Sequence, residues 1–328
     1  MTIMDCRPFL AVGVSFLAAV LISFSRRYPN VRESWSVIAS FIKFGLIISM
    51  VPGVLAGVTY EWTLFQITDT IGFTLRADSA GILFACLAAL LWIPINFYSI
   101  GYMRCNNEHE QTGYFAAFAI CMSSVMGIAM ASNLLTFFFF YELLTIASYP
   151  LVLHKRNEEA LLASRKYLIY TLISGQLFLA GLVAVYCISG TMDFKAGGFL
   201  TTDMAPTWQL QLIFLIMILA GSVKAAVMPL HGWLPAAMIA PTPVSALLHA
   251  VAVVKTGVFA VLRIIGFVFG PKLLADIGTA DILAWFAAGS IIISSLIAIQ
   301  QDNLKRRLAF STIGQLSYIC LLYTSPSP

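Results

Sequence analysis

The stretch MPLHGWLPAAMIAPTPVSALLHAVAVVK, residues 228–255, decides how this sequence folds. It contains four prolines, two histidines and a lysine, and strongly apolar residues flank it on both sides. Proline removes a helical hydrogen bond and clashes with the preceding turn, so the stretch predicts an interrupted helix. In a membrane, irregular backbone is tolerated only where protein buries it or water lines it. If the chain spans a membrane, this stretch therefore predicts a protein-lined, hydrated cavity.

Composition places the chain in a membrane. Of the 328 residues, 60% are hydrophobic and 10% are charged, with a mean hydropathy of +0.89. A soluble domain carries about 25% charged residues. The net charge of +4 indicates no nucleic-acid partner, because the placement of the basic residues accounts for it. The six cysteines are scattered without a CxxC spacing, which is typical of buried thiols.

Ten apolar runs are long enough to cross a bilayer, which takes roughly 20 residues per helix. The sequence therefore predicts an all-α polytopic membrane protein. The first run has no convincing cleavage site and is expected to be a retained helix. The polar, β-prone segment 61–78 predicts a short extramembrane hairpin. The predicted spans are 8–25, 35–58, 79–101, 113–131, 134–153, 165–189, 208–228, 243–265, 281–300 and 308–323.

The placement of lysine and arginine predicts the orientation. With the N-terminus outside, eleven basic residues fall in loops on one face and four in loops on the other. Cytoplasmic loops carry an excess of basic residues, so the richer face is predicted to be cytoplasmic. The cytoplasmic set is Arg26, Arg27, Arg32, Arg104, Lys155, Arg156, Arg165, Lys166, Lys305, Arg306 and Arg307, and the external set is Arg7, Arg76, Lys195 and Lys272.

Five charged residues fall inside the predicted spans, beyond the first two residues of each span. Each needs a reason, because a charge at mid-bilayer costs at least about 2.5–3.5 kcal/mol. Lys43 and Arg263 lie towards the ends of their spans and are predicted to extend their side chains to the interface. Glu142, Lys224 and Lys255 lie near the centres of theirs, and we predict that these three are functional.

Glu142 and Lys224 could form a proton switch. Desolvation disfavours the charged form of a buried lysine, whereas a nearby carboxylate favours it. A lysine that approaches a carboxylate and then leaves it would take up and release a proton, provided that the two helices come close together. Lys224 lies five residues before Pro229, so the predicted break in the helix is next to it.

His249 and Lys255 are predicted to be further proton stations on the next span. They lie six residues apart, which separates them by about 240° and about 9 Å on a regular helix, so a water wire would have to link them. Histidine titrates near neutral pH, and Ser245, one turn earlier, can orient its ring or a water. The supporting residues of the predicted site are His231, Ser245, Pro229, Pro241 and Pro243.

Other classes of function match the sequence less well. His231, His249 and Glu142 do not form a zinc motif, because the histidines are 18 residues apart and no HExxH is present. The sequence also has no phosphate-binding loop, paired-cysteine motif or haem signature, so we predict no metal, no cofactor and no catalytic chemistry in this chain. A purely structural membrane anchor is a less favoured alternative, since it would have no reason to keep three central charges.

The run KAAVMPLHGWLPAAMIAPTPVSALLHAVAVVKTGVF, residues 224–259, resembles the hallmark of the antiporter-like membrane subunits. These include the large proton-pumping subunits of respiratory complex I, those of membrane-bound hydrogenases, and the A-type and D-type subunits of Mrp-type cation/proton antiporters. Two further segments match this family, FFFFYELLTIASYPLV at 137–152 and QDNLKRRLAFSTIGQLSYI at 301–319. SIGYMRCNNEHEQTGYF, at 99–115, most resembles the D-type subunit of Mrp antiporters.

The resemblance implies a fourteen-helix fold with two inverted five-helix repeats, each with a broken helix. It implies that Glu142 on the fifth span, Lys224 on the broken seventh, and His249 and Lys255 on the eighth take part in proton translocation. This chain is then expected to be truncated at its C-terminus after about ten helices. The implied parts are an N-terminal three-helix region at 1–112, a first repeat with the proton site at 113–265, the start of a second repeat at 266–323 and a non-native tail at 324–328.

The function implied by the resemblance is translocation of protons, or of cations coupled to protons, by one of the subunits of an Mrp-type Na+/H+ antiporter. The alternative is a proton-pumping membrane subunit of complex I (NADH-quinone oxidoreductase) or of a membrane-bound hydrogenase, so membership of a redox enzyme stays open. The implied partners are other membrane subunits, protons, Na+ as a second candidate ion, and the lipid bilayer. The predicted location is the plasma (inner) membrane.

Overall fold

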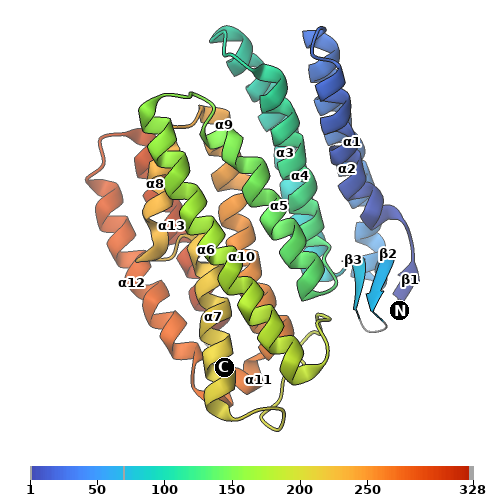
Figure 1. The fold of residues 1–328 in the computed structure, drawn as a ribbon, viewed down its shortest axis with the longest axis vertical. Coiled ribbons are helices and arrows are strands. Elements are labelled where there is room, and N and C mark those ends of the chain that lie inside the picture. Colours follow the sequence, from blue (N-terminus) through green and yellow to red (C-terminus); the bar gives the residue numbers. More distant parts are fainter. Residues whose placement is uncertain (1, 69–70, 325–328) are drawn as a thin grey trace. The chain divides into compact units, whose positions relative to one another are not determined.

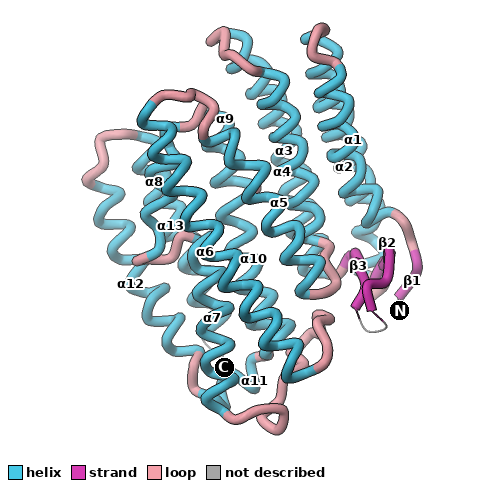
Figure 2. The backbone as a smooth tube through the Cα atoms, viewed as in Figure 1, coloured by secondary structure: helices cyan, strands magenta, loops and turns pink. Residues whose placement is uncertain are grey.

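A computed structural model describes residues 2–68 and 71–324 of the chain (Figure 1). The chain divides into two compact units, one made of Met1–Arg156 with Ala240–Ala252 and the other of Asn157–Ile239 with Val253–Pro328. Helices dominate both units, and a small sheet belongs to the first (Figure 2). Among the described residues, nine helical segments are long and apolar enough to cross a membrane. The prediction of an all-α polytopic membrane protein is therefore confirmed.

The first unit contains the N-terminal helices. In it, α1 packs against α2 and α4, α2 also packs against α3, and α4 packs against α5. The short segments α9 and η3, which come much later in the sequence, pack on α3. The bounds are α1 (Arg7–Phe24), α2 (Pro29–Leu55), α3 (Ser79–Cys105), α4 (Gln111–Ala129), α5 (Leu134–Val152), α9 (Thr242–Ala246) and the π-helical turn η3 (Leu247–Val251).

A three-stranded sheet accompanies these helices and covers the segment in which the sequence predicts a hairpin. Its strands are β1 (Thr2–Met4), β2 (Thr59–Thr68) and β3 (Ile71–Ala77); β2 pairs antiparallel with β3 and parallel with β1. The turn between α4 and α5 extends the pairing of β3, since the Arg76 amide donates to the Met130 carbonyl and the Ser132 amide donates to the Thr74 carbonyl. The sheet is therefore anchored to the helices.

The second unit begins with a long helix and contains the interrupted span. Here α6 packs against α7, α7 against α10, and α12 against α13. The bounds are α6 (Glu158–Ser189), α7 (Thr207–Ala225), η1 (Leu230–Gly232), α8 (Trp233–Ala236), η2 (Ala237–Ile239), α10 (Val253–Arg263), η4 (Ile264–Phe269), α11 (Pro271–Ile277), α12 (Ala280–Ile299) and α13 (Leu304–Thr324).

Every predicted span coincides with a helical segment, but the tenth does not meet the hydropathy of a membrane span. The predicted span 308–323 lies within α13, whose first turn holds three basic residues and whose middle holds Gln315 and Ser317. These polar side chains lower its mean hydropathy. Of the predicted tail, residues 325–328 lie outside the described residues.

Lys43 does not extend to the interface, so that prediction is wrong. Its side chain is fully buried, with 0% exposed. The ammonium group donates to the Met122 carbonyl at 2.9 Å and lies 4.5 Å from the centre of the Trp92 ring. A carbonyl acceptor and an aromatic face together replace the water that a lysine would otherwise need. These partners belong to α4 and α3, far from Lys43 in the sequence.

Arg263 is likewise buried, with 1% exposed, and the prediction that it reaches the interface is also wrong. Its guanidinium carbon lies over three aromatic rings of the second unit. The distances to the ring centres are 4.5 Å for Phe267, 4.9 Å for Phe259 and 5.1 Å for Phe194. Stacking on aromatic faces suits the planar guanidinium, which is more weakly hydrated than an ammonium group.

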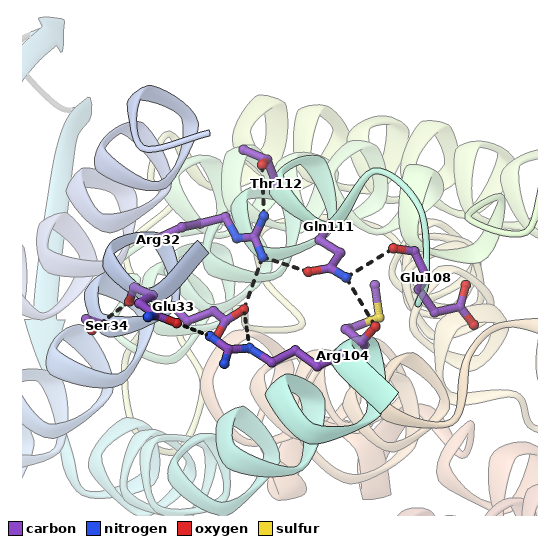
Figure 3. A network of polar contacts seen from close by, with 9 residues as sticks. Arg32, Glu33, Ser34, Arg104, Glu108, Gln111 and Thr112 are labelled. Carbon is purple, nitrogen blue, oxygen red and sulfur yellow. Dashed lines mark hydrogen bonds and ion pairs between the residues drawn. The ribbon is translucent and has the colours of Figure 1, made fainter. Parts of the chain in front are cut away.

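A network of charged side chains, two of them buried, links α2, α3 and α4 at one end (Figure 3). Helix α2 begins earlier than predicted, which places Arg32 and Glu33 inside it at 5% and 3% exposed. The Glu33 carboxylate accepts from Arg32 at 3.1 Å and pairs with Arg104, while Arg32 also donates to the Gln111 side chain at 2.7 Å. Two corrections follow: Arg32 is not a loop residue, and Glu33, which was not among the five charged residues predicted inside the spans, also lies in a helix long enough to cross the membrane.

Candidate functional site

The seventh span is interrupted where the prolines predict. Helix α7 ends at Ala225, and Ala226 adopts a φ of 57°, in the left-handed region that commonly ends a helix. The chain then continues through the short turns η1, α8 and η2. Pro229 precedes η1, and Pro235 lies in α8. The prediction of a broken seventh helix is confirmed.

Side chains satisfy the backbone groups that this break releases. The indole N–H of Trp233 donates to the Val223 carbonyl at 2.7 Å, near the end of α7. The Met228 amide donates to the Ser290 hydroxyl of α12 at 2.9 Å. In a membrane, each unsatisfied backbone group costs several kcal/mol. The break is therefore a built feature of the fold and not a frayed helix end.

Lys224 stands next to the break, one residue before the end of α7. Its side chain is fully buried, with 0% exposed. A cation in the last turn of a helix interacts favourably with the helix dipole, which partly offsets the cost of burial. The structure thus places Lys224 inside the protein at an interrupted span, as the sequence predicts.

Lys255 lies near the start of α10, which packs directly on α7. The close approach depends on Gly257, since a β-carbon there would lie 2.5 Å from the carbonyl carbon of Lys224. A β-carbon on Gly221 of α7 would likewise lie 2.9 Å from the Val261 side chain. The structure therefore brings Lys224 and Lys255 onto two helices in direct contact.

Gly257→Ala is expected to destabilise the second unit, because a methyl group has no room between α7 and α10. Overpacking of this kind costs about 1–3 kcal/mol in unfolding free energy. Thermal unfolding in detergent, followed with a thiol-reactive dye, measures the effect. Gly289→Ala in α12 is the matched control, since no heavy atom lies within 4 Å of that position. Equal unfolding temperatures for the two variants would contradict the close approach.

The eighth span is not a continuous helix. Residues Thr242–Ala246 form α9, a π-helical turn with His249 follows, and Ala252, at φ −102° and ψ −94°, separates this turn from α10. The offset of about 240° between His249 and Lys255 assumes a regular helix, so it does not apply. Single π-helical turns often occur at functional sites.

His249 and Ser245 do not make the contact that the sequence suggests. The Ser245 hydroxyl donates to the Pro241 carbonyl at 3.4 Å. Both ring nitrogens of His249 are buried and have no hydrogen-bond partner among the described residues. Buried polar groups nearly always have a partner, which can be water. The role of His249 as a proton station remains a prediction.

The other predicted residues are distributed over both units. Glu142 lies on α5 in the first unit and Lys224 in the second, so an ion pair between them remains a prediction. His231 lies in η1, with its ring centre 5.9 Å from that of Phe310 on α13. Pro241 and Pro243 flank the start of α9.

A cleft of about 460 Å³, with four polar or charged side chains among its lining residues, opens beside the break in the second unit. A cavity of this size has room for several waters, each of which takes up about 30 Å³. Waters in this cleft would contact α8 and η2, the turns that follow the break. The stretch 228–255 predicts a protein-lined cavity and supplies one wall of this cleft, but the sequence does not indicate which other two segments complete it. The lining residues are Glu159, Leu162, Ala163, Lys166, Pro235, Ala236, Met238, Ile239, Asn303 and Arg306.

These features define a class of membrane protein. Two successive spans are interrupted, and a lysine stands beside each interruption, at the end of α7 and near the start of α10. Discontinuous helices of this kind mark ion and substrate sites in transporters. The fold and the site are therefore those of a transporter-type polytopic protein.

Comparison with known proteins narrows this class to a family. Residues 131–325 match the family described as NADH:quinone oxidoreductase/Mrp antiporter, TM. The chain belongs to this family, and the resemblance stated from its sequence motifs is confirmed.

The relatives include subunits of antiporters and of oxidoreductases. The A-type subunit of the Na(+)/H(+) antiporter of Alkalihalophilus pseudofirmus is 30% identical, over 94% of this chain and 38% of its own length. The chloroplastic NAD(P)H-quinone oxidoreductase subunit 5 of Lotus japonicus is 28% identical, over 96% of this chain and 43% of its own length. The chain thus spans less than half the length of these relatives.

Two solved complexes share the fold. One is the membrane-bound sulfane sulfur reductase, an archaeal respiratory membrane complex, with a TM-score of 0.86 at 22% identity over 98% of this chain and 65% of that chain. The other is the Mrp complex from Dietzia sp., with a TM-score of 0.85 at 23% identity over 98% of this chain and 34% of that chain. The fold is therefore common to antiporter and respiratory complexes.

Proposed function

We propose that this chain translocates protons across the membrane as part of one of the subunits of an Mrp-type Na+/H+ antiporter. The observation that carries the proposal is Lys224, fully buried at the end of an interrupted membrane helix. An amine buried within a membrane span is costly, which favours a functional role for it. The similarity to the Na(+)/H(+) antiporter protein of Alkalihalophilus pseudofirmus supports the choice of complex.

In this proposal, water in the cleft described above delivers protons to the break that follows α7. Lys166 lines the cleft, and its ammonium nitrogen lies 3.2 Å from the place that a β-carbon on Gly232 would occupy, so this lining side chain lies against η1. From the break, Lys224 and Lys255 act as successive stations on the contacting helices α7 and α10. Glu142 and His249 are the remaining stations, and the Glu142 carboxylate controls whether Lys224 holds its proton.

The complete protein is proposed to work with other membrane subunits in the plasma membrane, with the N-terminus outside. Its place within an Mrp complex stays part of the proposal. The resemblance of residues 99–115 favours the D-type subunit, whereas the antiporter relative described above is of the A type. Na+ is the proposed counter-ion.

The second candidate function is proton pumping in a respiratory complex. The quinone oxidoreductase relatives are as similar to the chain as the antiporter relatives, at 28% against 30% identity. In that case proton movement would follow electron transfer and would not depend on Na+.

Vesicle transport by the complete complex separates the two functions. Inverted vesicles are first acidified inside by respiration, and a pH-sensitive dye reports the interior pH. An antiporter function predicts that added Na+ collapses the pH gradient, and that vesicles without the complex do not respond. A pH gradient that does not respond to added Na+ but increases with quinone reduction would overturn the antiporter proposal in favour of the second function.

The proposed orientation predicts the labelling of introduced cysteines. A membrane-impermeant maleimide added from outside should label Thr201→Cys and should not label Asp302→Cys; both positions are exposed in the structure. Cys6, Cys105 and Cys187 are also exposed and are replaced by serine beforehand. The reverse labelling pattern would place the N-terminus inside and reverse the proposed direction of transport.

A further inference from the structure

Two of the four histidines of the chain, neither of them part of the proposed proton path, lie together in the first unit. His109 belongs to the turn between α3 and α4, and His154 follows the end of α5. Their rings are stacked, with centroids 4.9 Å apart and 15° between the planes. Glu108 joins them, since its carboxylate lies 3.6 Å from Nε2 of His154.

We propose that Glu108, His109 and His154 bind a divalent transition-metal cation of the Zn2+ type. Each residue offers one ligand atom, and the three atoms lie within 4.8 Å of one another. Two imidazoles and one carboxylate are a common zinc ligand set that leaves a position for water. Ligands at about 2.0–2.2 Å from the metal must approach one another more closely than this. The exposed side chain of His109 has the freedom to close that gap.

His154 carries the strongest sign of a ligand. Only 7% of the residue is exposed, yet its Nε2 is buried and has no hydrogen-bond partner among the described residues. A buried polar atom without a partner costs about 1–3 kcal/mol, and a metal ion would supply the missing partner. The rings of Tyr114 and His154 pack in a T-shaped arrangement, with centroids 5.6 Å apart, which holds the orientation of the imidazole.

The surroundings of His154 favour its neutral form. Its pKa is lowered, first by burial and then by the neighbouring His109, while Glu108 acts in the opposite direction. Metals bind the neutral imidazole. The direction of this shift therefore agrees with the geometry of the proposed site.

The turn that carries the other two ligands is held in place. The Gln111 side chain donates to the Glu108 carbonyl at 3.1 Å and to the Met103 carbonyl at 3.1 Å. Figure 3 shows that the Glu108 carboxylate points away from the Gln111 amide, so it does not compete for that contact. Asn107 and Glu110 adopt φ values of 48° and 49°, which make the turn tight. A bound metal would join this fixed turn to the end of α5.

Metal titration of the full chain, produced without a polyhistidine tag and purified in detergent, tests the site. Zn2+ binding is measured by calorimetry, and Co2+ serves as a probe through its visible absorption in a tetrahedral site. We expect one Zn2+ per chain, with affinity at least about tenfold lower in His109→Ala and in Glu108→Gln, since each loses a ligand. Glu110→Gln, in the same turn but outside the ligand set, is the matched control and should bind like the wild type.

Thermal unfolding of each variant without metal separates a lost ligand from a lost fold. Both His109 and Glu108 lie in a turn that is at least partly exposed, so their variants should unfold at the wild-type temperature in metal-free buffer. Added Zn2+ should raise that temperature in the wild type and in Glu110→Gln alone. Absence of saturable Zn2+ binding, or unchanged affinity in His109→Ala, would overturn the site.

Discussion

Lys224→Ala is expected to abolish proton transport by the complete complex while leaving membrane insertion intact. Without the amine, a proton crossing the interrupted span would have no group to hold it, and a charge at mid-bilayer costs about 2.5–3.5 kcal/mol. Since each 1.36 kcal/mol is a factor of ten, transport should fall by about a hundredfold or more. The loss of a cation from the last turn of α7 is a much smaller effect on stability, of about 0.3–1 kcal/mol.

The dye assay in inverted vesicles measures this prediction, with the amount of inserted protein determined in the same vesicles. Lys195→Ala is the matched control, because Lys195 is an exposed lysine of the second unit, outside the helices. The control should transport at the wild-type rate. Transport at the wild-type rate by Lys224→Ala, at the wild-type level of insertion, would show that proton transport does not need this lysine.

Glu142→Ala should be almost as damaging, because in our proposal its carboxylate holds the proton on Lys224. If the two residues act as one unit, the double variant should lose little more than either single variant. If the two residues act independently, the fold-losses in transport of the two single variants should instead multiply in the double variant. Glu158→Gln, an exposed acid in the first turn of α6, is the control for the removal of a negative charge. Multiplying losses would contradict the coupling of Glu142 to Lys224.

The spans and the break could be predicted from the sequence because their causes are local. Hydropathy over some 20 residues locates a spanning helix, and prolines mark where a helix must stop. The same reasoning identifies Lys224, since a charge within such a span is costly wherever the rest of the chain lies. Its full burial beside the break agrees with this argument.

Partners that come from distant segments could not be predicted in this way. Lys43 and Arg263 are buried because a carbonyl and aromatic rings from other helices surround their charges. The cluster of His109 and His154 forms between two turns that the sequence separates by the whole of α4 and α5. No spacing rule connects such residues.

Small departures from regular helices were also invisible in the sequence. No proline or glycine lies within the π-helical turn at His249 or at the break at Ala252, so no residue there indicates an irregular helix. Hydropathy cannot distinguish a π-helical turn from an α-helical one, because both bury the same apolar side chains. A relation that assumes regular geometry, such as the offset between His249 and Lys255, therefore failed.

Proton transport by Lys224→Arg tests the central claim most directly, which is that Lys224 itself takes up and releases a proton. Arginine keeps its positive charge in proteins and cannot release a proton, so the variant preserves the charge and removes the exchange. In the vesicle assay at matched insertion, we predict that Lys224→Arg transports no faster than Lys224→Ala. Transport at the wild-type rate would contradict the claim and show that Lys224 serves only as a fixed charge.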